Sequence, residues 1–271
     1  MRDLCIAAQD TDAAEKGPAM TKNDQTLVKA SDFALALALL TRLPVHVSDF
    51  ARGARAAWSY PLVGLVLGGL AATIGVLGHW LGFHPAINAL ISLAVLIVLT
   101  GAMHEDGLAD TADGFWGGWD PARRLEIMKD SHIGAYGVIA IFLGLSARWS
   151  ALWILFDTSV ATAVTGLLSA AILSRAALPA MMAALPHARA SGLSHSTGRC
   201  PPRTAWLAIG LSIGLSWLLL GSTVWAAAPI VLVLGVGIAR LAQAKIGGQT
   251  GDVLGATQQL SEIAVLFLLV A

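Results

Sequence analysis

Seven long apolar runs are the feature of this sequence that most restricts its fold. They occupy residues 61–83, 86–103, 133–156, 159–185, 205–223, 229–246 and 254–271. A helix needs about 20 predominantly apolar residues to cross the hydrocarbon core of a bilayer, and each run approaches that length. We therefore expect an all-α fold, a polytopic membrane helix bundle with about seven transmembrane helices.

Composition and local pattern extend this expectation to the rest of the chain. Hydrophobic residues make up 56% of the 271 residues and charged residues only 13%, which exceeds the apolar content of soluble domains. Residues 33–43 are apolar, too short to span, and followed by Pro44, so they predict an N-terminal interfacial or re-entrant helix. Residues 1–30 lack the apolar core of a signal peptide and predict a disordered extension. We expect residues 31–271 to form a single membrane-embedded domain, which would then carry any catalytic site.

The basic residues predict the orientation of the bundle. If the seven runs alternate across the membrane, nearly all Lys and Arg fall in the segments of one side, which are 1–58, 104–132, 186–204 and 247–253. The positive-inside rule places these segments in the cytoplasm and the C-terminus outside. A channel or transporter needs polar groups along a path through the membrane, which this one-sided distribution argues against.

Charge and cysteine content exclude some partners and cofactors. The net charge is zero and no basic, aromatic-interleaved stretch occurs, so nucleic acid is not an expected partner. Cys5 and Cys200 lie far apart in polar segments and form no CxxC pair, so both are expected to be free thiols.

A run of carboxylates follows the second apolar segment. Glu105, Asp106, Asp110 and Asp113 lie within nine residues. In a helix, the three aspartates at i, i+4 and i+7 share one face and repel each other unless a cation lies among them. Mg²⁺ prefers such oxygen ligands and often binds substrate phosphates as well, so the run indicates phosphoryl chemistry at a membrane surface. A solvated acidic face is the alternative.

Two further polar segments are candidate binding elements. Lys129, Asp130 and Ser131 precede the third apolar run, where Lys129 is either a phosphate ligand or a flanking positive charge. Gly251 and Asp252 lie in a glycine-rich stretch that opens the last run. Backbone N–H groups there can bind an anion, and Asp252 can add a metal ligand.

Charges also occur inside the apolar runs, at Arg148, Arg175 and Glu262. A charge in the bilayer costs about 2.5–3.5 kcal/mol on insertion scales, so each should face the bundle interior or a polar cavity. They form either a structural ion pair, such as Arg175 with Glu262, or substrate contacts. The segment from His187 to His195 contains too few His residues for zinc and is either a phosphate contact or a plain loop.

Several of these motifs together resemble the cobalamin synthase family of adenosylcobinamide-GDP ribazoletransferases. They are the run from Glu105 to Gly114, the Lys129-Asp130-Ser131 element with Gly134, and Gly248-Gln249-Thr250-Gly251-Asp252 followed by Gln259 and Glu262. Thr41-Arg42-Leu43-Pro44 and Tyr60-Pro61-Leu62-Val63-Gly64 are similar to the N-terminal signature of that family. The resemblance covers about residues 31–271, and the acidic run is its most specific part.

The resemblance implies a multi-pass enzyme of the bacterial inner membrane that acts late in vitamin B12 assembly, with its active-site loops on the cytoplasmic side. Such enzymes join adenosylcobinamide-GDP to α-ribazole, or to α-ribazole 5′-phosphate, release GMP and use Mg²⁺. The implied metal ligands are Glu105, Asp106, Asp110 and Asp113, one of which could instead be the base for the attacking hydroxyl. The expected substrate contacts are Lys129, Asp130, Ser131, Arg148, Arg175, Gly251, Asp252 and Glu262. Association as a homo-oligomer or with other late cobalamin-pathway enzymes is also expected, although no residue identifies it.

Two alternative functions remain open at this point. Asp110-xx-Asp113-Gly114 looks like the start of the motif of CDP-alcohol phosphotransferases, but Gly117-Gly118 follows where that family continues with further conserved residues. A transporter or channel using Arg148, Arg175 and Glu262 would need a polar path to the outer face, and that face carries almost no charge.

Overall fold

The computed structural model describes residues 26–47 and 50–271, and the regular elements in these ranges are helices. In chain order they are α1 (Ala30–Leu40), the 3₁₀ helix η2 (Gly53–Ser59), α2 (Tyr60–Trp80), α3 (Pro85–Thr100), α4 (Met103–Gly117), α5 (Pro121–Ile127), α6 (Ala135–Thr158), α7 (Val160–Ala184), α8 (Leu193–Thr197), α9 (Pro202–Leu220), the 3₁₀ helix η3 (Gly221–Thr223), α10 (Val224–Ile246) and α11 (Gly251–Val270). The predicted all-α membrane bundle is confirmed. Of the predicted disordered extension, residues 1–25 lie outside the described ranges, and α1 already begins at Ala30.

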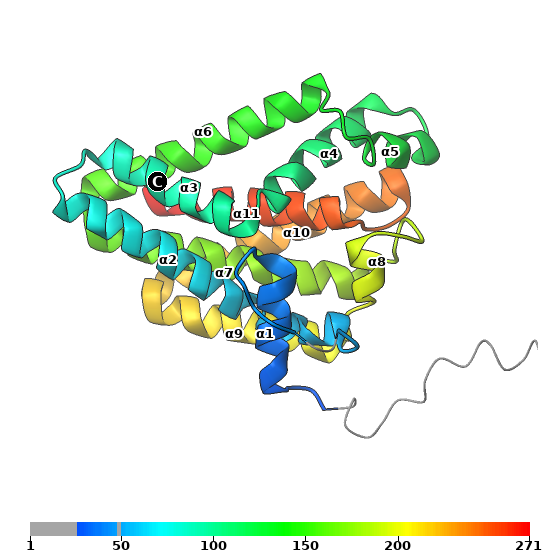
Figure 1. Ribbon diagram of the computed structural model, residues 1–271, viewed down its shortest axis with the longest axis horizontal. Coiled ribbons are helices and arrows are strands. Elements are labelled where there is room, and N and C mark those ends of the chain that lie inside the picture. The colour runs from blue at the N-terminus through cyan, green and yellow to red at the C-terminus, as the bar shows by residue number, and fades with distance from the viewer. Residues whose placement is uncertain (1–25, 48–49) are drawn as a thin grey trace, which may run out of the picture.

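α7 is the central helix of the bundle. It packs against α2, α6, α9, α10 and α11 (Figure 1). Small residues allow the closest of these contacts: a Cβ added at Gly64 of α2 would lie 2.2 Å from the backbone oxygen of Ala171. Helices in membranes associate largely through such close packing of small residues, because lipid offers no hydrophobic driving force between them.

Five helical stretches in the described chain are long and apolar enough to cross a membrane, and the bent pair α3–α4 would be a sixth. One of the five, Pro202–Ile246, consists of α9 and α10 joined through η3. The chain entering α9 contacts the end of α7 through Arg199 and Ala183, and the chain leaving α10 contacts it through Gln249 and Pro186. α9 and α10 therefore form an antiparallel hairpin, and each of the seven predicted runs corresponds to a helix. How many of them cross the bilayer stays a prediction.

The acidic segment after α3 is helical rather than a loop. α3 ends at Thr100, the next two residues have left-handed backbone angles (φ 64° at Gly101 and 58° at Ala102), and α4 leaves at 84° to α3. α4 and α5 therefore occupy most of residues 104–132, the segment between the second and third apolar runs. Because this segment is helical, the prediction that Asp106, Asp110 and Asp113 share one helix face applies.

α1 is a short apolar helix that ends before Pro44, as expected, and it runs across the direction of α2, α7 and α9 (Figure 1). Asp32 connects it to the following segment. The carboxylate of Asp32 accepts hydrogen bonds from Arg52 Nη2 and from Trp58 Nε1, both at 2.8 Å. This buried contact holds the first turn of α1 in place, and Leu39 and Leu40 in its last turn line a pocket.

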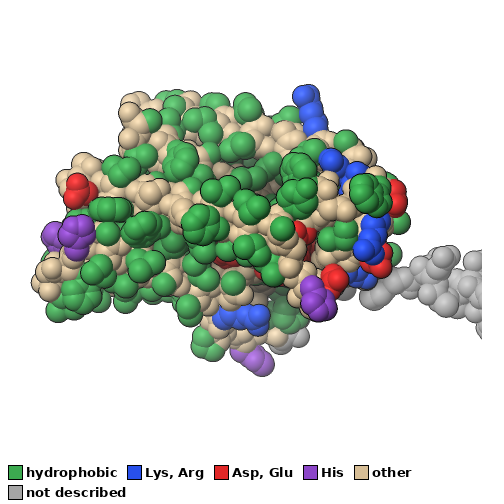
Figure 2. Space-filling view, turned by 90° about the horizontal axis from the view of Figure 1, so that it is seen from above, with side chains coloured by type: hydrophobic (Ala, Val, Ile, Leu, Met, Phe, Trp, Pro, Cys, Tyr) green, Lys and Arg blue, Asp and Glu red, His purple; other side chains and the backbone are tan. Residues whose placement is uncertain are grey.

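Apolar and basic side chains occupy different parts of the surface along the bundle axis. Hydrophobic side chains cover most of the face in Figure 2, and most of the visible Lys and Arg gather toward one end. In Figure 1 that same side of the view contains α5, α8 and the turn between α10 and α11, whereas the tight α2–α3 and α6–α7 connections lie at the opposite end. The predicted separation of polar segments from short turns is thus present in the fold.

Candidate active site

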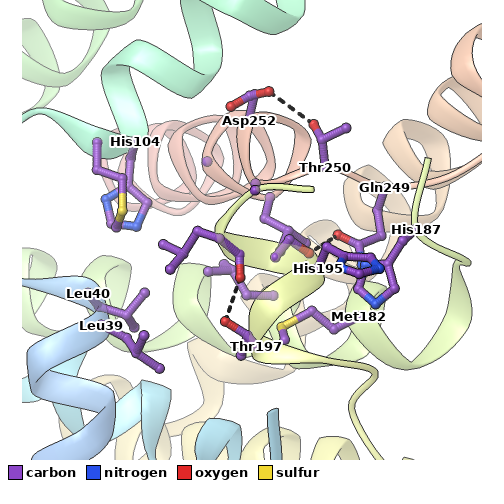
Figure 3. A pocket seen from close by; sticks show the side chains of 18 of the residues that line it. Leu39, Leu40, His104, Met182, His187, His195, Thr197, Gln249, Thr250 and Asp252 are labelled. Atoms are coloured by element: carbon purple, nitrogen blue, oxygen red, sulfur yellow. Dashed lines mark hydrogen bonds between the residues drawn. The ribbon is translucent and has the colours of Figure 1, made fainter. Parts of the chain in front are cut away.

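A pocket of about 220 Å³ lies where α1, α4, α7, α8 and the α10–α11 turn meet. Leu39 and Leu40 form an apolar part of its wall, and His187 and His195 lie on the opposite side, with Met182 close to the histidines (Figure 3). The polar lining also includes Asp106, Arg189, Gln249, Thr250, Gly251 and Asp252. A mixed wall of this kind suits a ligand that carries both charged and apolar parts.

The glycine-rich turn before α11 has a structural origin. Gly247 ends α10 with φ 78°, a left-handed conformation that favours glycine. Gly248 then passes so close to the chain after α7 that a Cβ would lie 2.3 Å from Pro186 O. Two backbone hydrogen bonds, Gln249 N to Pro186 O (2.8 Å) and Ala188 N to Gln249 O (2.9 Å), join the two segments. They position Gly251 and Asp252 in the first turn of α11.

The side chain of Gln249 fixes the loop that carries the two histidines. Its Oε1 accepts a hydrogen bond from Ser194 Oγ at 2.6 Å, so its Nε2 is the donor toward His187 Nδ1 at 2.9 Å. His187 must therefore be neutral, with its proton on Nε2. Burial, together with the nearby His195 and Arg199, lowers the pKa of His187 below its usual value and favours this neutral form.

Arg189 and Asp252 form an ion pair at the pocket wall. Asp252 Oδ2 also accepts a hydrogen bond from Thr250 Oγ1 at 3.2 Å, and Thr250 Oγ1 accepts one from Val253 N at the start of α11. Both members of the pair are partly exposed. The pocket thus holds a guanidinium, the residue type best suited to bidentate phosphate binding, beside a helix N-terminus.

The acidic helix α4 brings two more carboxylates to this wall. Gly107 packs against α11 so closely that a Cβ would lie 2.8 Å from Asp252 O. Asp106 is exposed and lines the pocket, and Asp110 follows one turn later on the same face. Asp106 and Asp252 act on Asp110 by like-charge repulsion, which Arg189 opposes. In the described chain, the side-chain carboxylates of Asp106 and Asp110 have no hydrogen-bond or ion-pair partner.

Asp113 has a structural role in this fold. Its carboxylate accepts hydrogen bonds from Gly134 N at 2.7 Å and from Gly137 N at 2.9 Å. Both donors lie at the start of α6, where N–H groups lack partners within the helix and the helix dipole favours a negative charge. Asp113 therefore joins the end of α4 to the beginning of α6.

Glu105 faces the interior of the bundle. Its Oε1 accepts a hydrogen bond from Arg148 Nη2 at 2.8 Å, and Arg148 Nη1 contacts Glu262 Oε1 at 3.3 Å. Arg175 Nη1 lies 4.0 Å from Glu262 Oε2. These four residues, called the buried charge network below, balance two positive and two negative charges and are at most 7% exposed. The ion-pair alternative for Arg175 and Glu262 is thus present, extended by Arg148 and Glu105.

Amide side chains of α11 complete the buried charge network. Gln259 Nε2 donates to Glu105 Oε1 at 3.2 Å, and Gln258 Nε2 donates to Glu262 Oε2 at 2.5 Å. Some polar atoms remain without a hydrogen bond, namely Glu105 Oε2, Arg148 Nε, Arg175 Nε and Gln259 Oε1. His104, at the edge of the network, is also a pocket-lining residue, so the network lies next to the pocket.

Lys129, Asp130 and Ser131 lie away from the pocket. All three are exposed in the connection between α5 and α6, and none lines the pocket. Asp130 accepts a hydrogen bond from His132, which satisfies its carboxylate locally. Of the predicted site residues, the structure therefore gathers Asp106, Asp110, Gly251 and Asp252, places Glu105, Arg148, Arg175 and Glu262 in the network beneath them, and separates the Lys129 element.

The carboxylates fit a Mg²⁺ site that is completed by substrate. No three His, Cys, Asp or Glu side chains of residues 26–47 and 50–271 are arranged to hold a metal ion on their own. Asp106 and Asp110 nevertheless have free oxygens, and Asp252 lies beside them. Mg²⁺ is commonly bound through one or two carboxylates plus substrate phosphates, so this donor set is compatible with it.

Comparison with known proteins identifies the family. The family model described as cobalamin-5-phosphate synthase matches residues 32–270. The chain belongs to this family. The resemblance recognised from the sequence is thereby confirmed, and the CDP-alcohol phosphotransferase and transporter alternatives gain no support.

Curated relatives of this cobalamin-5-phosphate synthase family member are named adenosylcobinamide-GDP ribazoletransferase. The protein of Bradyrhizobium diazoefficiens is 42% identical over 245 residues, covering 89% of this chain and 94% of the relative. That of Mesorhizobium japonicum is 42% identical over 240 residues, covering 88% and 92%. That of Brucella anthropi is 39% identical over 242 residues, covering 85% and 92%. No solved structure matches the chain.

Sequence reasoning did not assign a role to several residues that line the pocket of this cobalamin-5-phosphate synthase family member. Arg189, His187 and His195 were interpreted as either a phosphate contact or a plain loop, and Gln249 was only part of a motif. These residues share one property that the sequence does show. They are charged, imidazole or amide side chains in two segments that were assigned to the same side of the membrane. Only the fold shows that these two segments are hydrogen-bonded to each other.

Proposed function

We propose that this chain transfers the adenosylcobinamide-phosphate moiety of adenosylcobinamide-GDP to α-ribazole, or to α-ribazole 5′-phosphate, and releases GMP. The observation that carries the proposal is the match of residues 32–270 to the cobalamin-5-phosphate synthase family, whose carboxylate-rich α4 here adjoins a pocket containing Arg189. In this reaction a ribazole hydroxyl forms a new bond to the phosphorus on the cobinamide arm. The bond from that phosphorus to the bridging oxygen of GMP breaks.

Arg189 and the start of α11 are the anion-binding part of the proposed site. A guanidinium can donate two parallel hydrogen bonds to phosphate oxygens, and unpaired N–H groups at a helix N-terminus add further donors. Both would hold the diphosphate of the substrate and stabilise the negative charge that collects on the departing GMP. Most of the rate gain in phosphoryl transfer comes from such positioning and charge stabilisation.

Asp106, Asp110 and Asp252 are the residues that would hold Mg²⁺ together with the diphosphate. A bound Mg²⁺ supplies positive charge to the phosphoryl oxygens. Asp110, or its neighbour Asp106, is also placed to accept the proton of the attacking hydroxyl. Glu105 and Asp113 were predicted as further metal ligands, but their contacts with Arg148 and with the start of α6 make them the weaker candidates.

We further propose that the protein resides in the bacterial inner membrane with the pocket facing the cytoplasm. Support comes from the position of Arg189 in the pocket wall and from Arg123, Arg199 and Arg203, which lie in segments of the same predicted side. The predicted homo-oligomer, or complex with other late cobalamin-pathway enzymes, stays a prediction.

The decisive experiment measures GMP release from adenosylcobinamide-GDP plus α-ribazole by the purified, detergent-solubilised protein. We expect release in Mg²⁺, loss of release in EDTA, and a decrease of about 10²–10³-fold for Asp110→Asn, the size seen when one electrostatic contact to a transition state is removed. Asp157→Asn, at the exposed end of α6, is the matched control and should keep full activity. Absence of GMP release by the folded wild-type protein would reject the proposed reaction.

A further inference from the structure

A second and larger depression lies on the membrane-facing side of the bundle, away from the pocket. It is a groove of about 530 Å³ between α9 and α10, with α7 as its floor. Its lining includes Leu173 and Met181 of α7, Trp206 of α9, and Trp225, Leu232 and Val236 of α10. None of these residues contributes to the proposed phosphoryl-transfer site.

The groove is apolar over a length greater than the hydrocarbon depth of one membrane leaflet. Its lining on α10 extends from Trp225 to Ala239, which is about 21 Å at 1.5 Å per residue, against about 30 Å for the whole hydrocarbon core. Ser212 is the one lining residue with a hydroxyl, and its Oγ already donates to Ile209 O at 2.9 Å. Apart from the indole N–H groups of Trp206 and Trp225, the side chains of the lining offer no further polar group to water or to a polar ligand.

One end of the groove is positively charged. Arg199 donates a hydrogen bond to Ala183 O at 3.2 Å, beside the lining residue Ala184. Arg203 precedes Trp206 by one turn of α9, and Arg240 follows Ala239 on α10. All three arginines are exposed, and in the described chain none of them forms a salt bridge with a carboxylate. An apolar slot with unpaired arginines at one end is complementary to an anionic head group on an acyl chain.

We propose that this groove is a binding site for an anionic phospholipid of the surrounding membrane. One acyl chain lies between α9 and α10 against α7, and the phosphate of the head group contacts Arg199, Arg203 and Arg240. The leaflet is the one on the pocket side, because the arginines are at the end of α7 that also leads into the His187 loop. The inference does not depend on the proposed transferase reaction.

The test uses delipidated, full-length protein in detergent and measures its unfolding temperature as lipid is added. Dioleoyl phosphatidylglycerol is the anionic probe, and dioleoyl phosphatidylcholine, which has the same acyl chains, is the zwitterionic comparison. Gly235→Leu fills the groove, since a Cβ there meets no atom within 4 Å. Gly237→Leu is the matched control, because it also meets open space on α10 but does not line the groove.

We expect phosphatidylglycerol to stabilise the wild-type protein and Gly237→Leu at lower concentration than phosphatidylcholine, and Gly235→Leu to lose this response. The combined Arg199→Gln, Arg203→Gln and Arg240→Gln variant should need about tenfold or more phosphatidylglycerol for half-maximal stabilisation. Arg123→Gln, which removes an arginine from α5, should not.

Equal responses to the two lipids, or an unchanged response of both the Gly235→Leu and the triple arginine variants, would overturn the proposal. The arginine variant gives a result even if Gly235→Leu fails to fold. A dimer that dissociates on the Gly235→Leu change, measured by light scattering, would assign the groove to a second copy of the chain and also overturn it.

Discussion

Glu105 and Asp106 are neighbours in the sequence but have different environments. Glu105 is hydrogen-bonded to Arg148 inside the bundle, whereas Asp106 is exposed on the pocket wall. The sequence groups both as metal ligands because spacing alone does not show which carboxylate meets a buried arginine. At the residue scale, burial and partner identity therefore divide the acidic run into structural and pocket-facing members.

This division predicts opposite behaviour for two matched amide substitutions. Glu105→Gln should lower the unfolding free energy by about 3–5 kcal/mol, since it leaves Arg148 in the buried charge network without one of its carboxylates. Asp106→Asn should change stability little but raise the Mg²⁺ concentration needed for half-maximal GMP release. Denaturant unfolding and a Mg²⁺ titration measure the two effects. A shift of the Mg²⁺ requirement in folded Glu105→Gln would return Glu105 to the ligand set.

His187 gives the pocket a predictable response to acid. Its folded-state pKa is lowered, so its contribution to stability is complete above the usual value near 6.5 and declines as the pH falls below it toward the folded-state pKa. Protonation also removes the acceptor that Gln249 uses. We expect the unfolding temperature to fall between pH 7.5 and 5.5, and to fall less in His187→Asn, whose amide oxygen can still accept.

The control for this measurement is His46→Asn, which changes an exposed histidine outside the pocket. Its pH dependence should equal that of the wild-type protein. If His187→Asn and the wild-type protein lose stability in parallel, the hydrogen bond to Gln249 does not depend on the protonation of His187.

At the scale of elements, the crossing of α4 and α11 determines how close Asp106 and Asp110 come to Asp252. Gly107 of α4 contacts Asp252 and Gly255 of α11, and an added Cβ would lie 2.8 Å from Asp252 O. A backbone oxygen in a helix cannot move aside as a flexible side chain can. The distance between the carboxylates is thus set by the absence of a side chain at one position.

We predict that Gly107→Ala reduces GMP release by at least about tenfold, because a displacement of roughly 1 Å can cost up to about 10²-fold in rate. Gly117→Ala is the matched control in the same helix, where the nearest atom to a new Cβ is Ile127 Cδ1 at 3.6 Å. That substitution should leave activity unchanged and add up to about 1 kcal/mol of stability. Full activity in Gly107→Ala would show that the reaction does not depend on the close crossing of α4 and α11.

The helices could be predicted from the sequence, but the connections between them could not. Apolar runs of 18 residues or more have few alternatives to a helix in lipid, so the positions of α6, α7 and α11 follow from composition. The 84° bend between α3 and α4 depends on Ala102 at φ 58°, a conformation that alanine rarely adopts and that no pattern announces. The direction in which the acidic helix leaves α3 therefore could not be predicted from the sequence.

At the scale of the whole molecule, the distribution of Lys and Arg predicts the orientation in the membrane. Labelling of single cysteines tests this prediction. In a protein whose Cys5 and Cys200 are replaced, a single cysteine at position 157 should react with a membrane-impermeant maleimide added outside cells, and one at position 196 should not. Both positions are exposed in the structure. The reverse labelling pattern would place the pocket on the outer side.

The site as a whole was only partly predictable, because it is assembled from segments that only the fold brings together. Asp110 and Asp252 could be chosen from spacing and residue type, but Arg189 gained significance only from its ion pair with Asp252. Lys129 carries the same charge and lies in another segment of the same predicted side, yet it does not line the pocket. Sequence patterns identify chemically suitable residues, whereas long-range contacts decide which of them meet.

The buried charge network also has a consequence for biogenesis. Arg148, Arg175 and Glu262 belong to α6, α7 and α11, and their mutual neutralisation requires the last helix of the chain. Arg148 can already pair with Glu105 of α4, but until α11 is synthesised Arg175 has no carboxylate partner in the described chain, at a cost of about 2.5–3.5 kcal/mol. The buried charge network is therefore complete only after α11 has joined the bundle. A chain truncated before α11 should be recognised and degraded by membrane quality-control proteases rather than accumulate as a stable fragment.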